Sequence, residues 1–165
     1  MLRNRTLRFF IILLLSPFML ITARYGVCRI STHSNQTCLA SDPTAFTVND
    51  FTTFEPSEGN SIPASISFLY SDNNNALVAQ CFSSNDTGGT VSSAISGSPQ
   101  VSFTFTENNL TITEAYNVCS NETASIEAEG SLVVITHCYS NYPPSPYGNG
   151  IKCITPTGKL SGSFL

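Results

Sequence analysis

Apolar side chains recur at every second position along much of this chain. Between residues 62 and 70 the even-numbered positions are all apolar, and positions 63, 65 and 67 are Pro or Ser. Val101, Phe103 and Phe105 alternate with polar residues in the same way. A period of two is typical of a strand with one buried face, and no window shows the 3.6-residue period of a helix. The pattern therefore predicts an all-β chain.

Clusters of Asp, Asn and Glu separate the alternating runs and predict turns at 72–75 and 107–109. The predicted strands are 46–54, 62–70, 76–82, 101–105, 110–118, 125–129, 132–138, 151–155 and 159–164. Alternation slips near Asp50, as a β-bulge would cause. Gly130 is expected to turn the chain between 125–129 and 132–138. About seven to nine such strands predict an antiparallel β-sandwich or a small β-barrel, stapled by disulfides.

All six cysteines lie after residue 23, at Cys28, Cys38, Cys81, Cys119, Cys138 and Cys153. An even count in an exported chain predicts three disulfides, for which fifteen pairings exist. We prefer the pairing that joins near neighbours along a meander: Cys28 with Cys38, Cys81 with Cys119, and Cys138 with Cys153. Zinc sites use closer cysteine pairs, so we expect no metal, and we expect no cofactor.

The first residues have the pattern of an export signal. Arg3, Arg5 and Arg8 precede an apolar run over 9–21 and a small residue at Ala23. This order predicts a signal peptide over 1–23, because the run is too short to span a membrane. An N-terminal disulfide-containing segment over 24–44 and a single β domain over 45–165 are expected to follow. The product is expected to be secreted and extracellular.

Charge excludes two classes of partner. After residue 23 the chain has four Lys and Arg against eleven Asp and Glu, a formal net charge of −7. Nucleic acids and anionic membrane surfaces both require a basic footprint. We therefore expect no nucleic-acid partner and no membrane association after signal cleavage. N-x-S/T motifs at Asn35, Asn85, Asn109 and Asn121 fall in predicted turns or loops and predict N-glycosylation.

Few side chains suit catalysis. His33 and His137 are the only histidines, and no serine lies in a G-x-S-x-G motif. Glu127 and Glu129 share a predicted strand face, and Glu114 is expected to approach them across the sheet. These three carboxylates are the candidates for a glycan hydrolase, which needs two carboxylates in one cleft. A solvated strand face explains the alternating glutamates more simply, so we favour a protein without catalytic residues.

Three tyrosines occur between Cys138 and Cys153, at Tyr139, Tyr142 and Tyr147, in a segment that is rich in Pro and Gly. A loop closed by a disulfide and stiffened by proline loses little entropy on binding, and tyrosine is a frequent interface anchor. The three tyrosines are therefore the candidate binding surface. In the alternative interpretation the rings fold back and cap one end of the barrel.

Several runs together resemble a known family. They are 46–54, 65–68, 101–105, 110–114 and 129–138, with Cys81 and Cys119 between them. Over roughly residues 45 to 155 the chain resembles the fungal small secreted cysteine-rich proteins, especially those with the Alternaria major-allergen-like β-barrel. The resemblance implies a compact disulfide-bonded barrel without established catalysis, released by a filamentous fungus and sometimes acting as an effector or allergen.

The function predicted from these features is non-enzymatic binding of an extracellular protein or polysaccharide, in a host or a cell wall, through surface loops. Two alternatives stay open. One is the small secreted hydrolase that uses Glu114, Glu127 or Glu129. The other is a carrier of a small ligand in an apolar barrel interior, lined by residues such as Phe68 and Phe103, although barrels of this size are usually filled by their own side chains.

Overall fold

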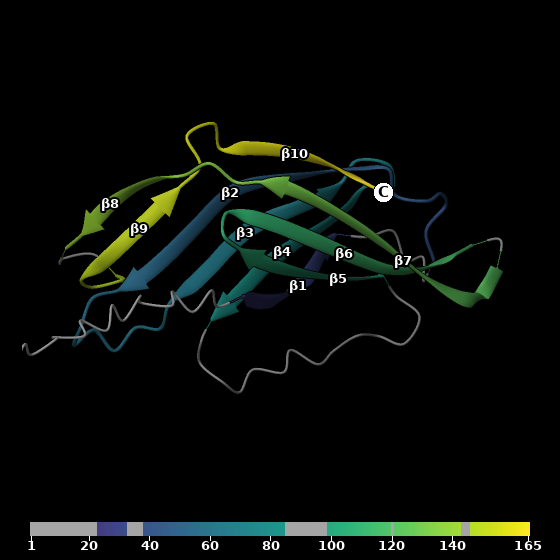
Figure 1. The fold of residues 1–165 in the computed structure, drawn as a ribbon. Coiled ribbons are helices and arrows are strands. Elements are labelled where there is room, and N and C mark those ends of the chain that lie inside the picture. The colour runs from purple at the N-terminus through teal and green to yellow at the C-terminus, as the bar shows by residue number, and fades with distance from the viewer. Residues whose placement is uncertain (1–22, 33–37, 85–98, 120, 143–145) are drawn as a thin grey trace, which may run out of the picture.

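The computed structural model describes residues 23–32, 38–84, 99–119, 121–142 and 146–165, and these form strands joined by turns and loops (Figure 1). The strands are β1 (Arg24–Thr32), β2 (Ala45–Pro56), β3 (Ser65–Asp72), β4 (Leu77–Ser84), β5 (Gln100–Thr106), β6 (Asn109–Val118), β7 (Asn121–Val133), β8 (His137–Asn141), β9 (Gly150–Ile154) and β10 (Lys159–Phe164). The predicted all-β class is confirmed, and of the two predicted architectures the chain adopts the barrel.

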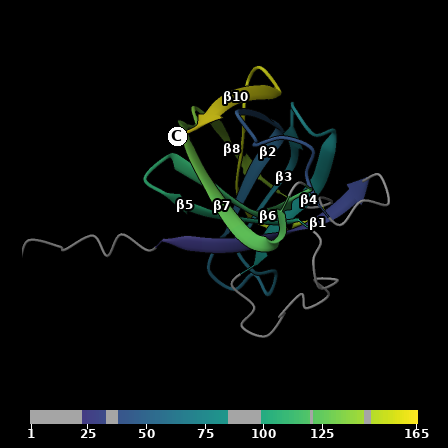
Figure 2. The same ribbon diagram turned by 90° about the vertical axis from the view of Figure 1, so that its right-hand side faces the viewer.

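Eight antiparallel strands close the barrel in the order β1-β4-β3-β2-β10-β7-β6-β5, with β5 returning to β1. Within this wall, β2 to β4 form one meander and β5 to β7 form a second. Strand β1 joins the meanders on one side and β10 joins them on the other (Figure 2). The segment 24–44, which the sequence interpretation set apart from the β domain, therefore contributes a wall strand.

Strand β2 has two different neighbours along one edge. Residues 45–49 pair with β10, whereas residues 52–56 pair with β9. Between them the register shifts and Asp50 has a φ of 55°, which confirms the predicted bulge. The Asp50 N–H donates to the Gly158 carbonyl (2.8 Å), which holds the β9–β10 turn against the bulge. Strands β8 and β9 consequently leave the ring and form a hairpin at one end of the molecule (Figure 1).

Aromatic rings fill the barrel interior. Phe51, Phe68 and Phe103 are buried, and the ring centroids of Phe68 and Phe103 lie 4.8 Å apart. Phe51 stacks on Phe68 at 5.7 Å and contacts Phe105 at 5.2 Å. Each buried ring contributes about 1.5–3 kcal/mol of apolar transfer free energy. The ligand-carrier alternative expected Phe68 and Phe103 to line a cavity. Instead, the rings of these two residues pack against each other.

The segment from Cys38 to Thr44 crosses the barrel end opposite the hairpin. The Leu39 N–H donates to the Asn117 carbonyl (2.8 Å) at the end of β6. Asn75, in the β3–β4 turn, donates from Nδ2 to the Ser41 carbonyl (3.0 Å). Because Leu39 is also buried, this short segment ties the two meanders together at that end.

One predicted turn is wrong. Gly130 does not end a hairpin but lies inside the continuous strand β7, which pairs with β6 and briefly with β10. A Cβ at Gly130 would overlap the carbonyl oxygen of Ser163 and stand 2.8 Å from Cε1 of Phe46. Glycine is needed here because two neighbouring groups approach the backbone closely, and a strand glycine can mark such an approach as well as a turn.

Gly130→Ala is expected to lower the free energy of unfolding by about 2 kcal/mol, the usual cost of overpacking a well-packed core. The added methyl group would push against backbone as well as the Phe46 ring, so relaxation of one side chain cannot relieve the overlap. Urea denaturation followed by circular dichroism measures the change. Ser131→Ala, at the exposed next residue, is the control and should alter stability by about 0.5 kcal/mol or less. Equal midpoints for the two variants would contradict this explanation of Gly130.

Candidate functional site

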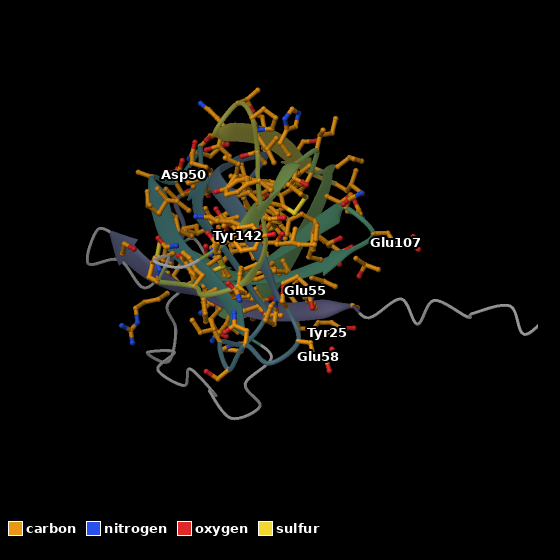
Figure 3. The ribbon with its side chains drawn as sticks, turned by 90° about the vertical axis from the view of Figure 1, so that its left-hand side faces the viewer. Tyr25, Asp50, Glu55, Glu58, Glu107 and Tyr142 are labelled. Atoms are coloured by element: carbon orange, nitrogen blue, oxygen red, sulfur yellow. A yellow bond between two sulfur atoms is a disulfide. The ribbon has the colours of Figure 1, made fainter. Side chains whose placement is uncertain are left out.

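The three candidate tyrosines all belong to the β8–β9 hairpin, but their surroundings differ. Tyr139 lies in β8 with 46% of its surface exposed, and Tyr142, just after β8, is 70% exposed. Tyr147, which precedes β9, is 38% exposed. Figure 3 labels Tyr142 in a view toward the hairpin end of the barrel. Two of the three tyrosines therefore present their rings to solvent, as a binding surface requires.

Tyr147 packs against the barrel wall. Its ring centroid lies 5.5 Å from that of Phe54, and Nζ of Lys152 lies 5.0 Å from the Tyr147 centroid. Phe54 is opposite Ser65 in the register, and the next residue of β3, Ile66, points into the core. Phe54 therefore points to the outer side of the wall, where Tyr147 helps to cover it. The alternative interpretation expected all three tyrosine rings to fold back onto the barrel. Of the three, Tyr147 is the one that packs in this way.

Hydrogen bonds hold the described parts of the loop between β8 and β9 in place. Asn60 donates from Nδ2 to the carbonyls of Tyr147 (2.9 Å) and Asn149 (2.6 Å). Asn141 donates from Nδ2 to the Gly148 carbonyl (2.8 Å). Residues 143–145 lie outside the described part of the chain. The tyrosines thus stand on a hairpin that is tied to the turn before β3.

The Cys138–Cys153 disulfide is confirmed, and it joins directly opposed residues of β8 and β9. The other two predicted pairings are wrong, because the disulfides are Cys28–Cys81 and Cys38–Cys119. Strand β1 lies beside β4, so that Cys28 faces Cys81 in the register. Leu39 bridges to Val118, which brings Cys38 next to Cys119. Cysteines that are close in sequence therefore form a disulfide only where their strands form a local hairpin.

The carboxylates of the hydrolase alternative lie on opposite faces of the wall. Glu114 is opposite Ala128 and is fully buried inside the barrel. Glu127 and Glu129 flank Ala128, point to the other face and are exposed. The expectation that Glu114 approaches these two glutamates is therefore wrong, whereas Glu127 and Glu129 share one face of β7 as predicted.

Glu114 is buried beside two other polar residues. The Tyr70 hydroxyl donates a hydrogen bond to Oε2 of Glu114, while Oε1 has no hydrogen-bond partner within the described residues. Burial raises the pKa of Glu114 from 4.5 to about 7; the Tyr70 hydrogen bond opposes this shift and the charge of Asp72 adds to it. Burial and the charge of Glu114 also raise the pKa of Tyr70. Because Glu114 is inaccessible to solvent, its protonation affects the stability of the fold. It does not change the charge of a site on the surface.

Asn109 and Asn121, two of the predicted glycosylation sites, begin strands. Asn109 is exposed at the start of β6, directly after a turn in which Glu107 and Asn108 have φ of 51° and 71°. Asn121 is the first residue of β7. Asn35, Asn85 and His33 lie outside the described residues, whereas His137 is exposed as the first residue of β8. Glycosylation at the four positions stays a prediction.

In the described ranges, no three or more His, Cys, Asp or Glu side chains are placed to hold a metal ion. Those ranges also include no helix with the length and apolar character needed to cross a membrane. The signal peptide predicted over 1–23 lies outside them except for Ala23.

Fold and cysteine pairing together define the chain as a disulfide-linked antiparallel β-barrel protein with an appended hairpin. No family model matches the chain, and neither the curated proteins nor the solved structures include a match. The resemblance to the Alternaria allergen-like family stays a prediction. Three disulfides are consistent with an extracellular protein, because such bonds persist in oxidising compartments.

Sequence reasoning missed Lys152 as a member of the candidate surface. Lys152 is opposite Tyr139 in the β8–β9 register and opposite Phe54 in the β2–β9 register. Side chains of directly opposed residues lie on one face of a sheet, so Lys152 stands between Tyr139 and the Phe54–Tyr147 contact. The distribution of charge along the sequence would have drawn attention to Lys152, because all eleven Asp and Glu precede residue 130 and Lys152 follows it.

Proposed function

We propose that the protein is exported and acts outside the cell as a non-enzymatic binding protein, which contacts an extracellular protein or polysaccharide through the β8–β9 hairpin. The observation that carries the proposal is the exposure of Tyr139 and Tyr142 on a hairpin that a disulfide closes. Tyrosine combines a large apolar ring with a polar tip and is enriched among the residues that dominate binding energy. A surface held in place before binding also loses less entropy when the ligand arrives.

The export signal predicted over 1–23, the three disulfides and the low charge of the chain support an extracellular site of action. A role as an effector-like protein of a filamentous fungus agrees with the family resemblance and is part of the same proposal. Glycans at the predicted sequons would be a further mark of the secretory route.

Tyr139→Ala and Tyr142→Ala are each expected to weaken binding about tenfold or more while the melting temperature stays unchanged. The measurement is titration of the purified protein against extracellular proteins and wall polysaccharides at up to tens of micromolar. Tyr25→Ala is a matched control, because Tyr25 is 73% exposed but lies on the barrel wall in β1. Figure 3 shows Tyr25 and Tyr142 at separate places on the molecule. No binding above background, or equal losses for Tyr25→Ala, would overturn the proposal.

A further inference from the structure

The β8–β9 hairpin differs in charge from the rest of the protein. Residues 137–154, which form the hairpin, include Lys152 and His137 but no Asp or Glu, whereas the rest of the chain after residue 23 contains all eleven acidic residues against two arginines and Lys159. An anionic ligand is therefore repelled by most of the molecule and accepted at this segment. Screening over about 8 Å at physiological ionic strength makes the local charge at the hairpin decisive for a ligand that lies directly on it.

A cation stands between aromatic rings on the outer face of the hairpin. The register places Tyr139 directly opposite Lys152, and Nζ of Lys152 lies 5.0 Å from the ring centroid of Tyr147. His137 is two residues before Tyr139 on the same strand and therefore shares its face. The nearest acidic residue of β2, Glu55, is next to Phe54, so its side chain points to the other face, where Arg24 pairs with it. Figure 3 shows Tyr142 apart from Glu55 and Glu58.

Taking the binding role of the preceding section as its basis, we propose that the ligand of this hairpin is a polysaccharide chain that carries uronic-acid carboxylates. Sugar rings present C–H faces that pack on tyrosine rings, and the Lys152 ammonium would pair with a carboxylate on the chain. The same surface would hold a neutral polysaccharide by ring contacts alone and so more weakly.

The size of the surface favours a single polymer chain over a folded protein. Five residues of β8 span about 17 Å, and the hairpin is two strands wide. This strip is smaller than the roughly 800 Å² that one partner contributes to a standard protein–protein interface. An extended polysaccharide needs only such a strip and gains affinity from repeated contacts along its length.

The test compares polygalacturonate, its fully methyl-esterified form and a neutral glucan as probes of the full mature chain at 50 and 500 mM NaCl. We expect polygalacturonate to bind most tightly, and esterification to weaken binding about fivefold, the effect of losing one exposed ion pair. Lys152→Gln should give the same loss, and Lys152→Arg should restore most of it. Lys159→Gln is the matched control, because Lys159 lies on β10 and should leave binding unchanged.

Each contrary result has a separate meaning. Equal affinity for the three polysaccharides, with Tyr139→Ala still damaging, would overturn the uronate assignment and leave the binding role intact. Binding of an extracellular protein through Tyr139 and Tyr142, with no polysaccharide bound, would do the same. Failure of every polysaccharide and protein to bind would overturn both proposals.

Discussion

Replacing Cys28 and Cys81 together with alanine is expected to lower the free energy of unfolding by about 4 kcal/mol. The two cysteines are 53 residues apart in sequence, and the chain-entropy model assigns about 4 kcal/mol to closing a loop of that length. Cys81 is also fully buried, so the variant loses packing around its sulfur. A loss of this size is a large part of the 5–15 kcal/mol that typically holds a domain folded.

Guanidinium chloride denaturation followed by far-ultraviolet circular dichroism measures this effect. The matched variant replaces Cys138 and Cys153, which are only 15 residues apart and join strands outside the barrel ring. Its loss should stay below about 3 kcal/mol, because the shorter loop carries less entropy and the hairpin can open while the ring stays folded. An equal or larger loss for the hairpin variant would contradict the larger stabilisation assigned here to the Cys28–Cys81 disulfide.

Stability should fall as the pH rises from about 4.5 to about 7, because Glu114 has a raised pKa in the folded protein. Below this range the carboxyl is protonated in both the folded and the unfolded chain. Within it the folded protein keeps a proton that the unfolded chain has released, so each increment of pH favours unfolding. The difference between 4.5 and about 7 corresponds to about 3 kcal/mol, all of it lost above the upper pH.

Glu114→Gln should remove this slope, because the amide does not titrate while its oxygen can still accept the Tyr70 hydrogen bond. Urea midpoints at intervals from pH 4 to pH 8 give the comparison. Glu129→Gln changes an exposed glutamate on the outer face of β7 and should keep the wild-type slope. A slope that persists in Glu114→Gln would show that Glu114 is not the group responsible for it.

Much of the candidate surface could be predicted from sequence, because its parts are close together in the chain. The three tyrosines lie between two cysteines 15 residues apart, and those cysteines pair as local spacing suggested. The separate role of Tyr147 could not be predicted, since it depends on Phe54 and Asn60, which are far from it in sequence. Lys152 was missed for the same reason: its place beside Tyr139 and the Tyr147 ring follows from strand register.

The alternation of apolar residues by itself determined the all-β class, most strand positions and the bulge at Asp50, because a period of two is a local property of an extended chain. Tertiary structure alone decided which distant strands meet. It placed β1 between β4 and β5, which set the Cys28–Cys81 pair, and Leu39 beside Val118, which set the Cys38–Cys119 pair. It also brought Ser163 and Phe46 against Gly130. Pairing between distant strands depends on how the whole set of apolar faces can be buried at once, and no short window of sequence records that requirement.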